Sequence, residues 1–433
     1  MRGLSPVLES SETGSRTESP SQGRGSAPSN EECQLPVSED EEGQETDESR
    51  RGSATPPPVA ATSGAAAALP PPDSSRVERR TQALGLFERA LRAPTRTSDT
   101  VASLPQTDYS PLPWQEFFQE KRFVGPGFCV YISGTLTDAS IPTLVLLHGG
   151  GHSALSWAAL VHYLRKRIPA SSLSVIAFDA RGHGETHDVQ PETDLSAETQ
   201  VQDAMAVLNA LFGGTQHIPP LVLVGHSMGG AIAVHLAASG LIPKLSGLMV
   251  IDVVETSALQ ALPYMQSFLA SRRKEFATVE DAIAYVVHGG HVRNLMSARC
   301  SVPPQLVAVD QQVSPVAGAE QSKVQRFRWR TELEHTEVHW RDWFTGMSRR
   351  FISVPAPKVL VLAGHDHLDR ELMVAQMQGR FQVVILPQAG HSVHEDLPEE
   401  VANTVAEFLR RYRLVKGAGE DPVLQAKLRH PVP

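Results

Sequence analysis

The amino-acid sequence predicts an α/β fold with a mostly parallel, doubly wound sheet. Short runs of aliphatic and β-branched residues alternate along the chain with longer segments of helical periodicity, an order that builds parallel β-α-β units. Several of the apolar runs end directly in glycine, histidine or aspartate. Because ligands of open α/β sheets bind at the carboxyl ends of the strands, these residues predict a functional site along that edge.

The predicted elements follow one another in a regular order. A Gly-Pro-Gly turn between two apolar runs predicts an edge hairpin at 123–132. Further buried strands are expected at 143–147, 174–178, 221–224, 247–251, 358–362 and 382–386, and helices at 154–168, 196–211, from 230 onward and at 399–413. Residues 256–350 combine helical periodicity with several prolines and three tryptophans, which predicts a helical cap over the strand ends. Such a cap would shape the pocket and exclude water.

Composition separates the two ends of the chain from this folded part. Residues 1–105 are rich in Ser, Pro, Glu and Ala and contain a single aromatic side chain, Phe87. They are predicted to be disordered, because they cannot bury enough apolar surface to offset the entropy of ordering. We expect one folded domain at 106–415 and a flexible tail at 416–433.

Charge and cysteine content exclude several classes of function. The formal net charge is −9, but residues 31–49 hold nine acidic residues, and the remaining 39 acidic residues balance 39 basic ones. This balance gives no reason to expect nucleic acid or an anionic membrane as a partner. Three distant cysteines form neither a disulfide framework nor a CxxC metal site. No segment approaches the ~20 apolar residues that span a bilayer, so we expect a soluble protein of a reducing compartment, the cytoplasm and/or the nucleus.

The sharpest signal is the turn Gly225-His-Ser227-Met-Gly229, which follows a run of four aliphatic residues and precedes a helix of small residues. This context is typical of the nucleophile elbow, G-x-S-x-G, in which a strained turn presents a serine above a parallel sheet. A Cβ atom at either glycine would collide with neighbouring backbone. The alternative, a chance glycine-serine turn, does not explain the strand and helix around it.

A second glycine cluster, His148-Gly-Gly-Gly-His152, follows the predicted strand at 143–147. Glycines placed directly after a strand let backbone N–H groups approach a ligand, and in this arrangement they supply half of an oxyanion hole. An ordinary glycine turn is the alternative. The charged loop at 179–186 is expected to brace the fold.

A serine nucleophile needs a base within hydrogen-bond reach and a third group that orients the base. His391 follows the last predicted strand after Gly390 and is the predicted base, with His394 as its rival. His226 is expected to point into the sheet. Two aspartates at strand ends, Asp252 and Asp366, satisfy the order of the chain, and the residues alone leave both open as the orienting acid.

His365, His367, His391 and His394 also invite a metal interpretation, because H-x-H and H-x-x-H pairs bind zinc. The serine-histidine pairing explains His391 with fewer assumptions. We therefore expect no metal site.

Longer motifs surround these residues. They are Ser110-Pro-Leu-Pro-Trp114, Leu147-His-Gly-Gly-Gly-His-Ser-Ala-Leu-Ser-Trp157, Gly225-His-Ser-Met-Gly-Gly-Ala-Ile-Ala-Val-His235, Met249-Val-Ile-Asp-Val-Val-Glu255 and Leu386-Pro-Gln-Ala-Gly-His-Ser-Val-His-Glu-Asp396. With them, residues 109–413 resemble the protein phosphatase methylesterases, α/β-hydrolases that demethylate the C-terminus of the type 2A phosphatase catalytic subunit. The sequence departs from that family in a longer N-terminal arm, a shorter hairpin at 118–131 and the lack of a long acidic insertion at 300–327.

The resemblance implies an α/β-hydrolase catalytic domain with Ser227 as nucleophile, His391 as base and Asp252 as orienting acid, which leaves Asp366 as a structural or alternative carboxylate. It also implies a C-terminal leucine methyl ester as substrate and the type 2A phosphatase catalytic subunit as partner. A broader carboxylesterase and a protein that masks the phosphatase by binding are the alternatives.

Two further implications of the resemblance concern the oxyanion and cofactors. The backbone N–H groups of Met228 and Gly150 would hold the oxyanion. The implied reaction needs neither a metal nor an organic cofactor.

Overall fold

The computed structural model describes residues 107–312, 323–364 and 368–415. All of them lie in the unit formed by Pro70–Pro433. The tails predicted at 1–105 and 416–433 fall outside the described residues.

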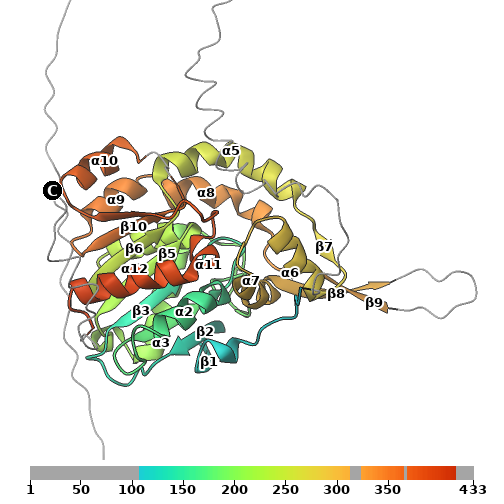
Figure 1. The fold of residues 1–433 in the computed structure, drawn as a ribbon, viewed down its shortest axis with the longest axis horizontal. Coiled ribbons are helices and arrows are strands. Elements are labelled where there is room, and N and C mark those ends of the chain that lie inside the picture. Colours follow the sequence, from blue (N-terminus) through green and yellow to red (C-terminus); the bar gives the residue numbers. More distant parts are fainter. Residues whose placement is uncertain (1–106, 313–322, 365–367, 416–433) are drawn as a thin grey trace, which may run out of the picture. The chain divides into compact units, whose positions relative to one another are not determined.

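The described part of the chain is built on an eight-stranded sheet with the order β1-β2-β4-β3-β5-β6-β10-β11. The strands are β1 (Glu120–Val124), β2 (Phe128–Ser133), β3 (Thr143–Leu147), β4 (Ser174–Phe178), β5 (Leu221–His226), β6 (Leu245–Ile251), β10 (Lys358–Leu362) and β11 (Gln382–Ile385). All pairs from β4 to β11 are parallel, while β2 is antiparallel to both β1 and β4. The predicted edge hairpin and the mostly parallel sheet are confirmed (Figure 1).

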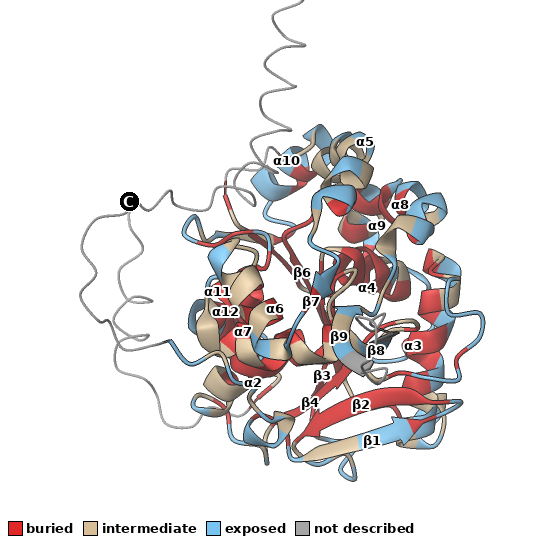
Figure 2. Ribbon diagram, turned by 90° about the vertical axis from the view of Figure 1, so that its right-hand side faces the viewer, coloured by how far each residue is buried: buried red, intermediate tan, exposed pale blue. Residues whose placement is uncertain are grey.

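Helices cover both faces of this sheet. The helices α2 (Ala158–Arg165) and α12 (Pro398–Arg411) pack on one face, and α3 (Ala197–Phe212), α4 (Met228–Ala238), α9 (Met347–Ser353) and α10 (Arg370–Met377) on the other. Strand β3 shows how the sequence produces two cores, because successive side chains of a strand point to opposite faces. Leu144 and Leu146 join the core under α2 and α12, whereas Val145 and Leu147 join the other. Figure 2 shows the resulting buried interior.

Short 3-10 turns accompany these helices. They are η1 (Trp114–Glu116), η2 (Ala154–Trp157), η3 (Thr215–His217), η4 (Pro303–Gln305) and η5 (Leu333–Thr336). The helix predicted at 154–168 therefore begins as η2 and continues as α2.

A long insertion separates β6 from β10. It contains the helices α5 (Glu255–Ser271), α6 (Val279–His288), α7 (Leu295–Ser301) and α8 (Glu337–Phe344), followed by α9. It also contains an antiparallel sheet with the order β7-β9-β8, formed by Glu275–Phe276, Lys323–Trp329 and Leu306–Gln312. Helical periodicity alone predicted no strand here. The sheet depends on a separate small core, in which the ring of buried Phe276 lies 5.2 Å from the ring of Trp329, more than fifty residues away.

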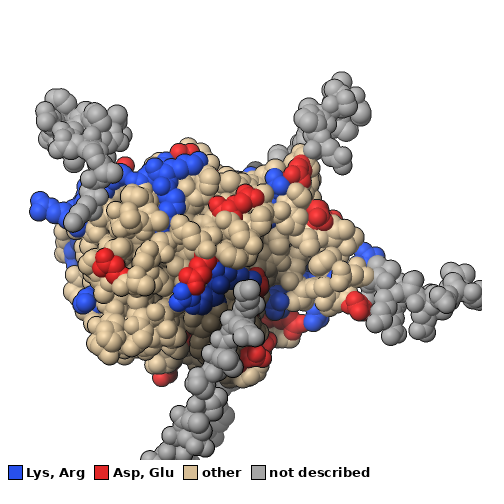
Figure 3. Space-filling model, turned by 90° about the horizontal axis from the view of Figure 1, so that it is seen from below, with Lys and Arg blue, Asp and Glu red and all other residues tan. Residues whose placement is uncertain are grey.

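No helix within the described ranges is both long and apolar enough to cross a bilayer. On the face of the molecule drawn in Figure 3, uncharged residues cover most of the surface, and basic and acidic side chains are interspersed among them.

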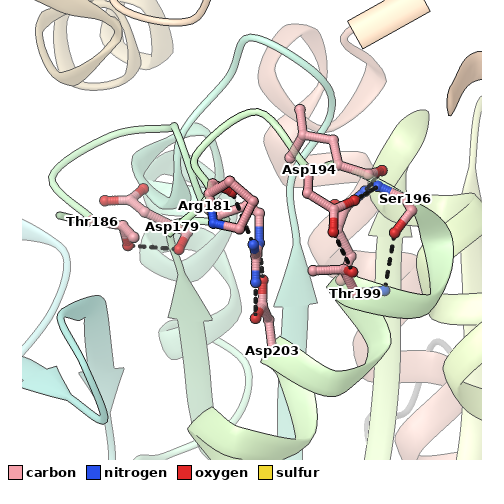
Figure 4. Close-up of polar contacts among 10 residues, drawn as sticks. Asp179, Arg181, Thr186, Asp194, Ser196, Thr199 and Asp203 are labelled. Carbon is pink, nitrogen blue, oxygen red and sulfur yellow. Dashed lines mark hydrogen bonds and ion pairs between the residues drawn. The ribbon is translucent and has the colours of Figure 1, made fainter. Parts of the chain in front are cut away.

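The loop at 179–186 braces the fold, as its charged residues were expected to do (Figure 4). The guanidinium of Arg181 donates two hydrogen bonds of 2.6 Å to the carboxylate of Asp203 in α3. The buried carboxylate of Asp179 accepts the N–H groups of Ala154 at 2.6 Å and Glu185 at 2.8 Å. Burial raises the pKa of Asp179 to about 6.

We expect Asp203→Asn to lower the free energy of unfolding by about 3 kcal/mol, because it leaves the buried guanidinium of Arg181 without its counter-charge. Urea unfolding at pH 7.5 measures this loss. As a control, Glu120→Gln removes the exposed partner of Arg122 and is expected to cost less than about 0.5 kcal/mol. Equal losses in the two variants would show that the Arg181 pair does not brace the fold.

Candidate active site

The turn between β5 and α4 holds Ser227 in a strained conformation. Ser227 has φ 51° and ψ −119°, a left-handed region that side chains rarely adopt. A Cβ atom on Gly225 would lie 2.1 Å from the carbonyl oxygen of Gly229, and one on Gly229 would lie 2.3 Å from that of Leu147. The two glycines are therefore required by close backbone contacts, as the motif predicted, and the turn points the serine side chain away from the sheet.

The structure brings Ser227, His391 and Asp252 together from three separate segments. Asp252 follows β6 with φ 53°, and its Oδ2 lies 2.8 Å from His391 Nδ1. Its Oδ1 accepts the N–H of Ala363 at 2.7 Å, which fixes the carboxylate. Because a carboxylate only accepts, His391 Nδ1 carries the proton and Nε2 is left to accept from Ser227 Oγ, 3.1 Å away. The side chain of Asp252 is 5% exposed and that of His391 is 52% exposed.

Two histidines hold the glycine loop that faces Ser227. His148 Nε2 accepts the N–H of Ala180 at 3.0 Å, and His183 Nε2 accepts the N–H of Gly151 at 2.9 Å. The N–H of Gly151 is thus occupied. Among the described residues, no protein group accepts from the N–H of Gly150 or of Met228, the first residue of α4. A Cβ atom on Gly150 would lie 3.9 Å from Met228 Cβ, so the two residues are neighbours at the site.

His226 supports the loop that carries His391. Its side chain is fully buried, and its Nε2 lies 2.9 Å from the carbonyl oxygen of His391, to which it donates. The expectation that His226 points into the sheet missed this contact. The contact joins residues 165 positions apart, and no local pattern in the sequence reveals it.

Asp396 links the same loop to the insertion. It ends the short helix α11 (Val393–Asp396), and its Oδ2 accepts the N–H of Gly390 at 2.6 Å. Its Oδ1 accepts the N–H of Arg293, between α6 and α7, at 2.7 Å. Ser297 of α7 adds a hydrogen bond of 2.7 Å to the carbonyl oxygen of Glu395. Burial raises the pKa of Asp396 to about 6.

Ser227 and His391 open into a cavity of about 320 Å³ between the sheet edge and the insertion. The insertion lines it with the inner side of α5 and with Trp329, Trp340, Trp343 and Phe344. The indole N–H of Trp340 donates to Thr336 Oγ1 at 2.8 Å and that of Trp343 to the carbonyl oxygen of Leu195 at 2.7 Å. Because their polar atoms are occupied, these rings offer apolar surface to a ligand.

The other residues that the sequence offered as base, acid or metal ligands do not join Ser227, His391 and Asp252 among the described residues. His394, the rival base, is fully buried, and neither of its ring nitrogens has a hydrogen-bond partner among the described residues. Asp366, His365 and His367 lie outside the described residues. Within the described ranges, no group of three or more His, Cys, Asp or Glu side chains could hold a metal ion.

Residues 144–404 match a family model described as "Alpha/beta hydrolase family". This range includes the elbow and the segments that carry Asp252 and His391. A solved structure titled "Crystal Structure of E-2-(Acetamidomethylene)succinate Hydrolase" is similar in fold, with a TM-score of 0.51 and 21% identity over 67% of this chain and 99% of that chain. The chain is a hydrolase of the alpha/beta hydrolase family.

Proteins of higher sequence identity show which family of alpha/beta hydrolases the chain belongs to. Protein phosphatase methylesterase 1 of Homo sapiens is 43% identical over 348 residues, which cover 72% of this chain and 88% of the human protein. The corresponding protein of Schizosaccharomyces pombe is 36% identical over 76% of this chain and 94% of its own length. "Probable protein phosphatase methylesterase 1" of Caenorhabditis elegans is 40% identical, with coverages of 78% and 89%. The chain belongs to the protein phosphatase methylesterase family, which confirms the resemblance.

We expect Asp396→Asn to lower kcat/KM for an ester substrate by about 10- to 100-fold. The amide loses one of the two acceptors that hold Gly390 and Arg293, and small displacements of a catalytic group can cost about 100-fold in rate. Steady-state hydrolysis of a p-nitrophenyl ester measures the effect. Asp188→Asn, at a side chain that is 79% exposed, is the control and should leave the rate unchanged. Equal rates for both variants would contradict the role of Asp396.

Buried histidines should make the protein sensitive to acid. Burial lowers the pKa of His148, His183, His226 and His394, that of His183 to about 4. Below the ordinary pKa of 6.5 the unfolded chain binds protons that the folded chain does not. Each such histidine therefore costs about 1.4 kcal/mol of stability per pH unit until its folded pKa is reached. Asp179 and Asp396, whose pKa values are raised, act in the opposite direction but are fewer.

We therefore expect the free energy of unfolding in urea to be at least about 2 kcal/mol lower at pH 5.0 than at pH 7.5. Unchanged or greater stability at pH 5.0 would show that these histidines are not kept neutral by the fold.

Proposed function

We propose that this protein is a serine esterase that hydrolyses the methyl ester on the C-terminal leucine of the type 2A protein phosphatase catalytic subunit. The observation that carries this proposal is the hydrogen-bonded series Asp252–His391–Ser227, here called the relay, at the mouth of an apolar cavity. Asp252 Oδ2 lies 2.8 Å from His391 Nδ1, and His391 Nε2 lies 3.1 Å from Ser227 Oγ. Membership of the protein phosphatase methylesterase family supports the substrate.

Acylation uses the relay directly. His391 Nε2 takes the proton of Ser227 Oγ as the oxygen attacks the ester carbonyl carbon, and Asp252 stabilises the imidazolium that forms. The N–H groups of Met228 and Gly150 hold the developing oxyanion, a type of contact that contributes about 3 kcal/mol per donor elsewhere. The tetrahedral intermediate collapses when His391 returns the proton to the methoxy oxygen, and methanol leaves.

Deacylation repeats these steps with water. The acyl-enzyme is an ester between Ser227 Oγ and the leucine carbonyl carbon. His391 takes a proton from a water molecule that attacks this carbon, and then returns it to Ser227 Oγ. The products are a free C-terminal carboxylate and regenerated enzyme. Each step uses only groups of this chain and water.

The cavity suits an apolar C-terminal residue. Its volume of about 320 Å³ lies at the lower end of the range of ligand pockets, and aliphatic and aromatic side chains dominate its lining. Burying an isobutyl side chain there would contribute roughly 2 kcal/mol to binding. A methyl ester adds no charge to this surface, whereas the carboxylate product would be charged and would leave more readily.

Ser227→Ala should lower kcat for a methylated phosphatase tail peptide by at least about 10⁴-fold and abolish labelling by a fluorophosphonate probe. Mass spectrometry of the peptide and in-gel fluorescence of the probe measure the two effects. Equal labelling of the wild type and the variant would remove Ser227 from the chemistry.

Asp252→Asn should lower kcat by about 10³- to 10⁴-fold, because the amide favours the wrong tautomer of His391. Asp366→Asn is the matched comparison, since Asp366 is the other aspartate that the order of the chain allows. It should change kcat less than tenfold. The reverse ranking would assign the orienting role to Asp366.

The two alternative functions predict different results with the substrate peptide and with the phosphatase. A broader carboxylesterase would hydrolyse an aryl ester but not the methylated peptide. A protein that acts only by masking the phosphatase would still inhibit it fully as the Ser227→Ala variant. Preferential hydrolysis of the peptide by the wild type, lost in that variant, is the outcome expected here.

A further inference from the structure

The lining of the cavity contains one unusual side chain, Arg272. It is the only Lys or Arg among the described lining residues. The other lining residues that the insertion contributes are apolar or neutral. Asp252 is the only Asp or Glu in the same lining, and its two oxygens already contact His391 and Ala363. The cavity therefore holds no free counter-charge for this guanidinium.

Arg272 lies at the C-terminal end of α5. It follows the last residue of α5, a helix that begins at Glu255, three residues after Asp252. A helix of 17 residues is about 25 Å long. The backbone of Arg272 is thus about 25 Å from the start of this helix, at the end of α5 that is away from Asp252.

The neighbouring Arg273, in contrast, is paired with a carboxylate. Its guanidinium binds the carboxylate of Asp281 with contacts of 3.0 Å and 2.6 Å. No described carboxylate lies within ion-pair distance of Arg272. The carboxylate of Glu334, on the neighbouring segment η5, lies 4.0 Å from Lys274 Nζ.

Arg272 is held in place although it has no carboxylate partner. Its guanidinium carbon lies 4.3 Å from the ring centroid of Trp329, a stacking contact that arginine favours. The indole N–H of Trp329 donates to the carbonyl oxygen of Arg273 at 2.8 Å, so the ring itself is fixed. The guanidinium of Arg272 is thus half-buried, stacked on a fixed ring and without a carboxylate partner among the described residues, so it can bind an anionic ligand.

We propose that Arg272 binds an acidic side chain of the substrate peptide, within about seven residues before the esterified C-terminus. The proposal rests on the proposed function and names the substrate feature that the cavity selects. Methylation removes the charge of the terminal carboxyl group, so the anion must come from a side chain upstream. An extended peptide advances about 3.3 Å per residue, and the length of α5 therefore sets the limit of about seven residues.

The arrangement divides recognition between two parts of one cavity lining. The apolar lining next to Ser227 takes the C-terminal side chain, and the guanidinium stacked on Trp329 takes the carboxylate. A charge-assisted pair in a partly desolvated site changes affinity by about 10- to 100-fold. We expect this factor to appear in KM, because the contact is remote from the atoms that react.

The test uses the full-length protein and synthetic peptides that end in leucine methyl ester. One Asp is placed in turn at each of the seven positions before the leucine, and each peptide is paired with its Asn counterpart. The wild type should cleave one or two of the Asp peptides with a kcat/KM at least tenfold above that of the Asn partner. Arg272→Gln should bring this ratio close to one, and Arg272→Lys should retain part of it.

Arg273→Gln is the matched control and should leave the Asp/Asn ratio at its wild-type value. Because the ratio compares two substrates of the same preparation, it does not depend on the fraction of folded variant. Arg272→Glu should invert the preference toward peptides with Lys at the selected position.

Three outcomes would overturn the proposal. Equal cleavage of Asp and Asn peptides by the wild type at every position would overturn the role of Arg272 alone, as would an unchanged ratio in Arg272→Gln. If the wild type cleaves none of the peptides but hydrolyses an aryl ester, the proposed function fails, and the recognition of an acidic peptide fails with it.

Discussion

The site depends on two residues held in backbone conformations that L-amino acids rarely adopt. Ser227 and Asp252 have φ values of 51° and 53°, at the ends of the neighbouring strands β5 and β6. Such conformations cost about 1–3 kcal/mol each and persist only where the surroundings impose them. Here the Ser227 N–H donates to Ile251 at 3.0 Å and the Asp252 N–H to Val361 at 2.8 Å. Hydrogen bonds across the sheet thus stabilise both turns, and the parallel sheet acts as the rigid support from which the two side chains project.

His391 differs from these two residues because it lies in a loop rather than at a strand end. Its backbone is held from the core by the buried ring of His226 and from the insertion through Asp396. The insertion is therefore more than a cover over the cavity. Its segment between α6 and α7 contacts the loop that carries the predicted base, so the position of the insertion and the geometry of the relay are physically linked. The exposed outer surface of α5 contrasts with these buried contacts (Figure 2).

The cavity is chemically asymmetric. Near Ser227 it is lined by the glycine loop, the imidazole of His391 and apolar side chains, which suit the neutral ester of an apolar residue. Where α5 ends, its lining has a single guanidinium, that of Arg272, stacked on the indole ring of Trp329. The same fold thus separates the contacts that act on the reacting bond from those that can select a peptide. This separation allows selectivity for a peptide substrate to change without altering the geometry of the relay.

Local sequence by itself predicted the strands of the large sheet from continuous apolar runs. It predicted the elbow at Ser227 and the glycine loop from glycines in tight turns, and His391 from its position after the last strand. It left Asp252 and Asp366 open, and only the family motif favoured Asp252. The sheet β7-β9-β8, the contacts of His226 and Asp396 and the place of Arg272 in the cavity lining came only from the tertiary structure. Each of these depends on groups distant in sequence that meet after folding, such as Arg293 with Gly390 or Phe276 with Trp329. Hydrogen bonds and packing of this kind have no local periodicity, so the sequence carries no short-range pattern that reveals them.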